Sequence, residues 1–302
     1  MKSYNRRGLT HWVGTAAVAL TVAGVLAVFG SPTASAGIKE TKHNLGSQQA
    51  GLNNEGTAAN EFSGTGEICV FCHTPHGADT QAKIPLWNRV ATASPAYATY
   101  NSLGTLSLDG GTAAVGSTSM ACLSCHDGTQ AMNTVANAPG SGLDGNAAWA
   151  AGIDTGAGWS GSHQSAGKMT GLAAVAADAS GLKNDHPVGI QYAGGPNANG
   201  VPATGTYPKA NFTDPDFKDA SSAVLGGSQV WWVETGTTGR QKTDLPLYAR
   251  TATVTFTDGS TSEVVNQPFV ECASCHDPHS EKATFLRTEN TNSAVCLACH
   301  DK

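Results

Sequence analysis

The amino-acid sequence predicts a chain that is mostly coil, with short helices at four repeated cysteine motifs and one small β-hairpin. Three observations lead to this prediction. Charged residues make up only 13% of the 302 residues, and all eight cysteines lie in the repeated motif. Residues 44–66, 102–120 and 134–181 are rich in Gly, Ala, Ser, Asn and Thr and show neither helical nor strand periodicity. Such stretches bury too little side-chain surface to order themselves. The chain therefore needs something other than these side chains to form its core.

Each cysteine belongs to a Cys-x-x-Cys-His motif, and no cysteine is left over for a disulfide or a free thiol. Paired cysteines in an exported protein normally indicate disulfides, but a histidine directly after each pair is typical of heme c attachment. A structural zinc site needs four thiolate or imidazole ligands rather than this motif repeated intact. We therefore expect four covalently attached hemes c, bound through Cys69, Cys72, Cys122, Cys125, Cys272, Cys275, Cys296 and Cys299.

The histidine of each motif is expected to bind the iron of its own heme, because it follows the second cysteine directly. These proximal ligands are His73, His126, His276 and His300. Four flat macrocycles tethered to the chain would supply the missing core. We therefore expect the polypeptide to wrap around a four-heme stack.

Five further histidines downstream of the N-terminal segment are candidate distal ligands: His43, His76, His163, His186 and His279. Because four hemes need four, histidine on both faces of every iron is feasible. His76 and His279 lie three residues after a proximal histidine and emerge on its side of the heme. We expect each to ligate a neighbouring heme; the alternative is hydrogen bonding to propionates. His163 lies in a Gly- and Ser-rich segment typical of a solvated loop, so the expected distal set is His43, His76, His186 and His279.

The motifs alternate between two forms. The first and third continue as Cys-His-x-Pro-His, through His76 and His279, whereas the second and fourth have the form Cys-Leu-x-Cys-His-Asp, through Asp127 and Asp301. This alternation predicts a duplicated unit of two hemes, with parallel drift of short motifs as the alternative.

The N-terminus predicts a secretory signal peptide over residues 1–36. Basic residues at Lys2, Arg6 and Arg7 precede an apolar stretch, and Ala34-Ser35-Ala36 forms a small-residue cleavage site. An uncleaved membrane anchor is the alternative, because the apolar stretch is long enough to span a bilayer. The signal peptide places the mature protein in the periplasm, outside the cell or on the cell surface.

Residues 37–302 are expected to form one tetraheme domain. Hemes 1 and 2 lie in 69–126, a Gly/Ala/Ser-rich insert with a β-hairpin occupies 134–268, and hemes 3 and 4 lie in 272–300. The hairpin is predicted at Leu247–Phe256 and Thr261–Val265, because Asp258-Gly259 favours a tight turn between strands rich in Thr and Val. Gln229–Glu234 is a further candidate strand. The net charge of −6 argues against nucleic acid as a partner.

Six short segments together form a recognisable pattern: Lys42–Leu45, Cys69–Gly77, Pro85–Arg89, Cys122–Gly128, Asp185–Gly189 and Cys272–His279. They resemble the doubled Cys-x-x-Cys-His family of multiheme c-type cytochromes from metal-reducing bacteria. Within that family the chain is most similar to the tetraheme cytochromes that polymerise into extracellular nanowires. The resemblance implies bis-histidine hemes in a continuous stack, the distal set named above, and in some members a distal histidine supplied by the next subunit. Residues 90–118 and 134–181 match no pattern.

These features predict an electron carrier rather than an enzyme, because six-coordinate irons leave no position for a substrate. The expected partners are other redox proteins, with a homopolymer as an extension. A periplasmic reductase with one open heme is an alternative, although the sequence marks no such heme. A membrane-anchored quinol dehydrogenase is another, although those tetraheme proteins pack their motifs closely, whereas Cys125 and Cys272 lie far apart in this sequence.

Overall fold

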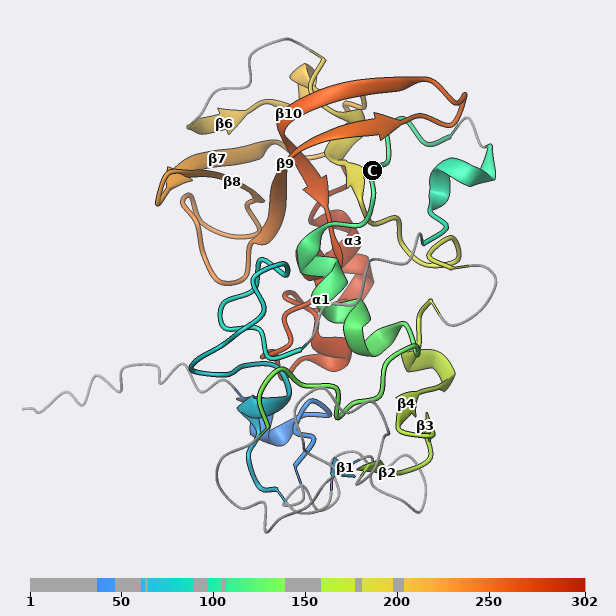
Figure 1. Cartoon of the computed structure of the whole chain (residues 1–302). Coiled ribbons are helices and arrows are strands. Elements are labelled where there is room, and N and C mark those ends of the chain that lie inside the picture. Colours follow the sequence, from blue (N-terminus) through green and yellow to red (C-terminus); the bar gives the residue numbers. More distant parts are fainter. Residues whose placement is uncertain are drawn as a thin grey trace, which may run out of the picture. The chain divides into compact units, whose positions relative to one another are not determined.

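The computed structural model describes residues 37–46, 61–62, 65–89, 97–104, 107–138, 159–176, 181–197 and 204–301 (Figure 1). All of them belong to one compact unit, Ala36–Lys302. The predicted signal peptide, and parts of the low-complexity stretches 44–66, 102–120 and 134–181, lie outside the described residues. Within the described ranges, no helix combines the length and apolar character needed to cross a membrane.

The largest element in the described residues is an antiparallel sheet of six strands in the order β5-β10-β9-β8-β7-β6. Strands β6 to β10 follow one another as a meander, and β5 pairs with the far edge of β10. The strands are β5 (Ile190–Gln191), β6 (Gly205–Tyr207), β7 (Ala220–Leu225), β8 (Ser228–Val233), β9 (Leu245–Thr255) and β10 (Thr261–Val270).

The predicted hairpin is present as β9 and β10, the two long curved arrows of Figure 1. Its turn contains Gly259 at φ +83°, a left-handed conformation that favours glycine. The register shifts between Val264 and Gln267, where Asn266 has φ +51° and accepts a hydrogen bond from the Trp231 indole at 3.1 Å. The candidate strand at 229–234 corresponds to β8.

The sheet extends beyond the predicted hairpin, because β6 and β7 add two strands that the sequence pattern did not indicate. Strand β7 contains two serines and two alanines, so it lacks the alternation that marks a half-buried strand. It is nevertheless paired along its length with β8 through a turn at Gly226 and Gly227, both with positive φ. Long-range pairing therefore places these residues in the sheet.

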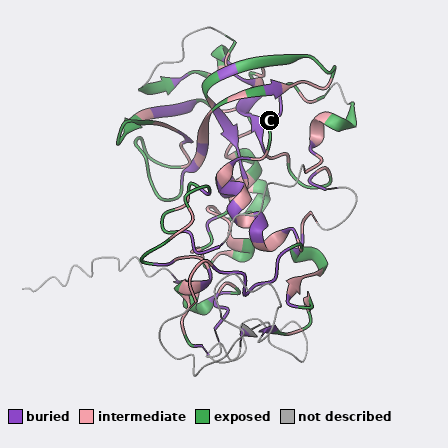
Figure 2. Cartoon of the chain, viewed as in Figure 1, coloured by how far each residue is buried: buried purple, intermediate pink, exposed green. Residues whose placement is uncertain are grey.

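An aromatic core lies against the sheet. Tyr192, Tyr207, Phe212 and Trp231 are almost fully buried, and their rings meet edge to face at 4.8–6.1 Å between centroids. Edge-to-face contacts add to the free energy gained by burying the ring surface. In Figure 2 the strands of the sheet have buried segments in purple between intermediate and exposed ones. The sheet thus has a protein core of its own.

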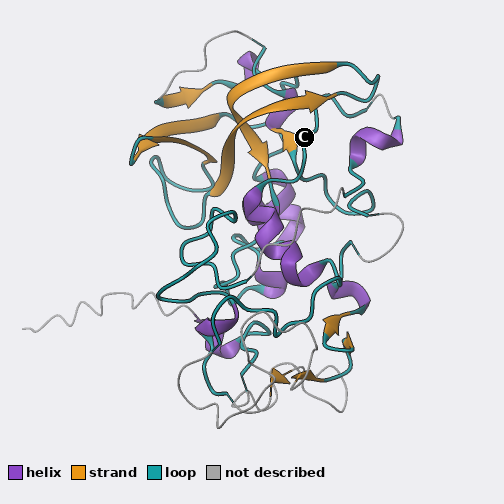
Figure 3. Ribbon diagram, viewed as in Figure 1, coloured by secondary structure: helices purple, strands orange, loops and turns teal. Residues whose placement is uncertain are grey.

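Outside the sheet the chain forms short helical turns joined by loops (Figure 3). Two further antiparallel pairs consist of two-residue strands. Strand β1 (Glu61–Phe62) pairs with β2 (Trp159–Ser160), and β3 (Gln164–Ser165) pairs with β4 (Lys168–Met169). The α-helices are α1 (Ser117–His126), α2 (Cys272–Cys275) and α3 (Ala294–Leu297). The 3-10 turns are η1 (Gly37–Glu40), η2 (Cys69–Phe71), η3 (Tyr100–Leu103), η5 (Gly171–Ala173), η6 (Tyr192–Gly194), η7 (Lys209–Asn211), η8 (Ala283–Phe285) and η9 (Thr291–Ser293).

A second, smaller apolar cluster lies next to the first two motifs. Phe62 stacks on Phe71 and on Trp159 with centroid distances of 5.3 and 5.9 Å. Cys72 and Cys125 pack at its margin. The cysteines of motifs 1 and 2 therefore adjoin an apolar surface.

Candidate heme-attachment sites

Each of the four cysteine motifs includes helical backbone: motif 1 begins with η2, motif 2 ends helix α1, motif 3 begins with α2 and motif 4 begins in α3. The backbone N–H of the motif histidine donates to the carbonyl of the first cysteine in motif 1 (2.7 Å, His73), motif 3 (3.1 Å, His276) and motif 4 (2.9 Å, His300). His126 of motif 2 is the last residue of helix α1. The short helices expected at the motifs are present, and in each one the two cysteines and the histidine lie on one turn.

Three of the motif histidines donate the ring Nδ1–H to a backbone carbonyl. His73 bonds to Pro85 at 2.8 Å, His126 to Ala173 at 2.7 Å and His276 to Thr284 at 2.8 Å. A carbonyl oxygen only accepts, so Nδ1 must carry the proton and Nε2 keeps its lone pair. A carbonyl partner of this kind orients metal-binding histidines and fixes their tautomer. The three rings are therefore prepared to bind a metal through Nε2.

After motif 1 the chain folds back onto the motif in a return segment that ends at Asn88. The backbone N–H of Thr74 donates to the carbonyl of Leu86 at 2.9 Å, and that of Asn88 donates to the carbonyl of Cys72 at 2.9 Å. Leu86 has φ +58°, which turns the chain back towards the motif. This segment also contains the carbonyl that holds the His73 ring.

Motif 3 has the same return segment with different residues. Asp277 N–H donates to Phe285 at 2.8 Å, Arg287 N–H donates to Cys275 at 2.9 Å, and Phe285 has φ +59°. The bonding pattern therefore repeats between motifs whose sequences both continue as Cys-His-x-Pro-His. This repetition supports the predicted duplication over parallel drift of short motifs.

Two pairs of histidine rings lie at a centroid distance that fits one metal ion between them. The ring centroids of His73 and His279 are 6.3 Å apart with planes at 12°, and those of His43 and His126 are 6.1 Å apart with planes at 70°. A metal–imidazole bond is about 2 Å and the ring centre lies about 1 Å behind the nitrogen, so ligands on opposite faces have centroids about 6 Å apart. Both pairs thus suit an iron with two axial imidazoles.

The surroundings of His43 keep its ring neutral. The ring stacks on Phe285 at 4.0 Å between centroids, and Nδ1 bonds to the Pro278 carbonyl at 3.2 Å. Burial, and then the neighbouring His126, lower the pKa of His43 from 6.5 to about 4. Burial also lowers the pKa of His126. Imidazole binds a metal in its neutral form, so both shifts favour ligation.

His279 is oriented by a carboxylate two residues before it. The Nδ1 atom of His279 lies 3.4 Å from Asp277 Oδ1, and the same oxygen accepts the His279 backbone N–H at 2.9 Å. The hydrogen bond from His279, then Arg287, lowers the pKa of Asp277. A carboxylate partner of this kind raises the basicity of a ligating imidazole.

The remaining predicted distal residues are placed differently. His76 and His186 are exposed, and in the described ranges neither ring contacts a motif histidine. Asn137 donates to the His76 carbonyl at 2.9 Å, and His186 Nδ1 lies 3.0 Å from the carbonyl of Pro187. His163 is partly buried. The ring of His300 lies 4.3 Å from that of Phe217 between centroids.

Cysteines of successive motifs are neighbours in space. The neighbouring Cys272 thiol and burial raise the pKa of Cys122, and helix α1 packs against α2. Burial, followed by Cys125, raises the pKa of Cys72 to about 12, and burial followed by Cys275 raises that of Cys299 to about 12. All eight cysteines lie in described residues and none forms a disulfide. Motif 1 therefore lies near motif 2, motif 2 near motif 3, and motif 3 near motif 4.

A buried arginine that the sequence reasoning overlooked joins motifs 1 and 2. Arg89 is 0% exposed and donates to the carbonyls of Ser124, Ala131 and Met132 at 2.9–3.0 Å. Its Nε has no hydrogen-bond acceptor among the described residues. The sequence signal for this role is a cation that directly follows Leu86, Trp87 and Asn88.

A buried glutamate, also overlooked, joins motifs 2 and 3. Glu271 is 1% exposed and accepts from Ser119 Oγ at 2.7 Å, the Gly116 N–H at 3.2 Å and Arg250 at 2.8 Å. Ser119 Oγ in turn accepts the Cys272 N–H at 2.9 Å. Burial raises the pKa of Glu271. One carboxylate thus binds the N-terminus of α1 and fixes the start of α2.

Comparison with known proteins identifies the C-terminal motifs. Residues 265–302 match a protein-family model described as the doubled CXXCH motif. No curated protein and no solved structure matches the chain at a significant level. The match covers motifs 3 and 4 and indicates covalent binding of heme c, electron transfer and a multiheme c-type cytochrome.

Proposed function

We propose that this chain is an exported tetraheme c-type cytochrome in which residues 37–302 wrap around four bis-histidine hemes and pass electrons between other redox proteins. The observation that carries the proposal is the spacing of two histidine pairs, 6.3 Å and 6.1 Å, each suited to one iron. The carbonyl-bound Nδ1 atoms and the proximity of successive motifs support it independently.

The proposed ligands of the first two hemes follow from the paired rings. Heme 1 is attached to Cys69 and Cys72 and bound by His73 with His279 on the opposite face. Heme 2 is attached to Cys122 and Cys125 and bound by His126 with His43.

The ligands of heme 3 follow from the duplication. Heme 3 is attached to Cys272 and Cys275 and bound by His276. Since His279 of motif 3 faces His73 of motif 1, the matching residue His76 is proposed as the reciprocal ligand of His276. The repeated return segments behind the two motifs support this exchange.

The ligands of heme 4 involve an exposed residue. Heme 4 is attached to Cys296 and Cys299 and bound by His300, with His186 as the proposed distal ligand. The exposure of His186 would allow the ring to reach the heme of a second copy of the chain. A homopolymer linked in this way is part of the proposal.

Bound heme supplies the one-electron Fe(III)/Fe(II) couple, whose potential depends on axial ligands and burial. The residues of this chain hold the rings of His73, His126 and His276 in one tautomer, and burial lowers the pKa of His43 and His126. With an imidazole on each face of every iron, the sites accept and release electrons without binding a substrate. For this reason an enzyme activity is not proposed.

Heme content and spin state test the proposal directly. Protein matured in a host with a heme-attachment system should have the mass of the polypeptide plus four hemes and show only low-spin iron. A colourless preparation, or one with the bare polypeptide mass, would rule the proposal out. A high-spin signal in the wild type would instead favour a reductase with one open heme.

Substitution of His279 tests the first ligand pair. His279→Ala should turn one of four hemes high-spin in magnetic circular dichroism, whereas the control His163→Ala should leave all four low-spin. The angles between ring planes add a second test, because near-parallel and near-perpendicular imidazoles give different low-spin electron paramagnetic resonance signals. Four low-spin hemes in the His279 variant would contradict the assignment.

Export and assembly need separate measurements. A mature N-terminus at Gly37 would support signal-peptide cleavage, whereas a retained N-terminal segment would favour a membrane-anchored quinol dehydrogenase. Electron micrographs of purified protein should show thin filaments if the chain polymerises. Uniform small particles would reject the polymer and leave the electron carrier intact.

A further inference from the structure

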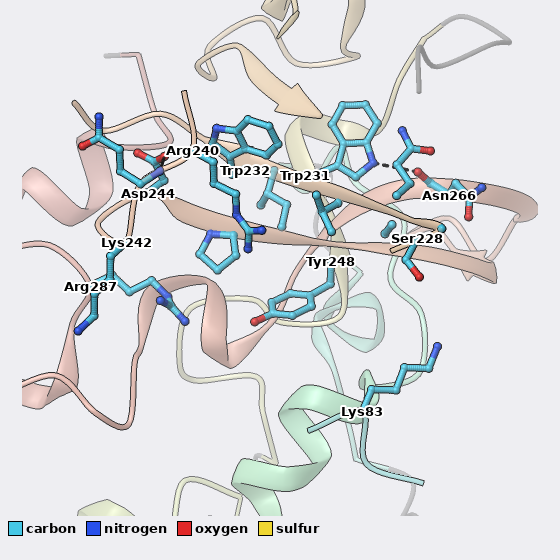
Figure 4. A pocket seen from close by; sticks show the side chains of 17 residues that line it. Lys83, Ser228, Trp231, Trp232, Arg240, Lys242, Asp244, Tyr248, Asn266 and Arg287 are labelled. Carbon is cyan, nitrogen blue, oxygen red and sulfur yellow. Dashed lines mark hydrogen bonds between the residues drawn. The ribbon is translucent and has the colours of Figure 1, made fainter. Parts of the chain in front are cut away.

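A cavity of about 590 Å³ lies beside β8 and β9 and is lined by four cationic side chains (Figure 4). The cations are Lys83, Arg240, Lys242 and Arg287, and the only acidic residue among the described lining residues is Asp244. In Figure 4, Arg240, Lys242 and Arg287 lie on one side of Tyr248, and Lys83 approaches from the other. This concentration of positive charge is unusual in a chain of net charge −6.

The carboxylate of Asp244 does not neutralise these cations. Its Oδ1 accepts the Thr235 N–H at 3.0 Å, and its Oδ2 accepts the Gln241 N–H at 2.6 Å. Arg287 donates from Nε to the Ala273 carbonyl at 2.9 Å and lies 3.6 Å from Asp277. In the described part of the chain, the side chains of Lys83, Arg240 and Lys242 form no ion pair or hydrogen bond. Three of the four cations, all except Arg287, therefore have no anionic partner among the described residues.

The aromatic wall of the cavity also contains an unused donor. Trp232 is 7% exposed, and its Nε1 has no hydrogen-bond acceptor among the described residues. A buried N–H without an acceptor carries a desolvation cost. A ligand that offers acceptor oxygens next to a flat apolar surface would complement Trp232, Tyr248 and the cations together.

The cavity adjoins the attachment cysteines of motif 3. Arg287, which lines it, donates its backbone N–H to Cys275 at 2.9 Å and its Nε to Ala273. Tyr248, which also lines the cavity, belongs to β9, and β9 packs against α2, the turn that carries Cys272 and Cys275. A heme tethered at Cys272 and Cys275 is therefore within reach of this surface.

We propose that the cavity binds the propionate carboxylates of the heme attached at Cys272 and Cys275, with Arg240 and Lys242 as their principal cationic partners. The inference rests on the proposed function, because it presupposes heme at motif 3. Heme c has a flat apolar ring with thioether links at one edge and two carboxylates at another. The cavity offers an aromatic wall, an unused N–H and cations in one place.

The cations are expected to set the potential of that heme. Positive charge near the ring disfavours Fe(III), which carries one more positive charge than Fe(II), and so raises the midpoint potential. Arg240 and Lys242 are thus positioning and tuning residues that leave the iron ligands unchanged.

The test is a redox titration of full-length holoprotein carrying Arg240→Gln and Lys242→Gln together. Both residues are exposed, so folding and the content of four low-spin hemes should be unchanged. The midpoint potential of one heme should fall while the other three keep theirs, and the shift should shrink as salt is added. As a control, Lys39→Gln removes one exposed charge in η1 and should leave all four midpoint potentials unchanged. Arg240→Lys, with Lys242 retained, keeps both charges and should keep the wild-type midpoint potentials.

Two results would overturn the inference without affecting the proposed function. One is four low-spin hemes with unchanged potentials in the double variant. The other is a holoprotein structure in which the propionates of the motif 3 heme bind elsewhere. A wild-type protein without heme would instead remove the proposed function itself.

Discussion

The six-stranded sheet and the segments that carry the cysteine motifs are held together by different interactions. In the sheet, antiparallel strands pair along their length and pack against an aromatic core that includes Trp231 and Tyr207. In the motif segments, single helical turns are tied to one another by side chains that bond backbone carbonyls, such as His73 and Arg89. The first region contains its own apolar core. The second contains the two histidine pairs that we propose as iron ligands, so we expect its order to depend on heme.

Loss of heme should cause the largest difference between the two regions, measured as protection from hydrogen exchange. Chain produced without heme attachment is expected to lose protection from hydrogen exchange over 69–89, 117–126 and 272–301. Strands β9 and β10 should keep theirs, because paired strands over a packed core do not need the cofactor. Hydrogen exchange measured by mass spectrometry would check this expectation. Equal loss of protection in both regions would show that the sheet also depends on heme.

Removal of the Glu271 carboxylate should destabilise the junction between motifs 2 and 3. Glu271→Ala leaves the Arg250 guanidinium and the first turn of α1 without their partner, at a cost of about 3–5 kcal/mol. Urea unfolding, monitored by heme absorbance, measures this loss of stability. The exposed Glu263→Ala serves as the matched control, with an expected change within about 0.5 kcal/mol. Similar midpoints for the two variants would contradict the role of Glu271.

A cavity in the aromatic core should affect the sheet alone. Leu245 is 0% exposed, and Leu245→Ala is expected to cost about 2–5 kcal/mol through lost contacts and the cavity left behind. Leu225, which is 48% exposed in β7, provides the control Leu225→Ala. Tryptophan fluorescence should report the loss while the heme spectra keep their low-spin form. A change of spin state in Leu245→Ala would show that the two regions are coupled.

The smallest expected effect concerns the C-terminus beside His300. Lys209 and Lys218 pair with Asp301 and lower its pKa from 3.8 to about 2. The lowered pKa means that these ion pairs stabilise the fold fully above pH 3.8 and lose this contribution as the pH falls towards 2. Asp301→Asn should therefore be slightly less stable than the wild type at pH 7 and match it near pH 2. A difference in urea midpoint that does not change with pH would exclude the ion pairs as its cause.

Sequence patterns predicted the parts of this protein that depend on neighbouring residues. The helical turns of the motifs, the β9–β10 hairpin and strand β8 follow from local spacing, turn residues and β-branched composition. Strands β6 and β7 did not follow, because their Ser and Ala residues are placed by pairing across the sheet. Arg89 and Glu271 were missed for the same reason, since each acts on backbone groups far away in sequence.

By itself, the sequence determined the chemistry of attachment, because two cysteines and a histidine on one turn are a local arrangement that spacing specifies. Which imidazole faces which was decided by tertiary structure. His279 lies more than 200 residues from His73, and His43 lies more than 80 residues from His126. Their positions depend on the return segments, on buried side chains that bond distant backbone groups, and on ring stacking. These contacts form only when distant segments pack against one another.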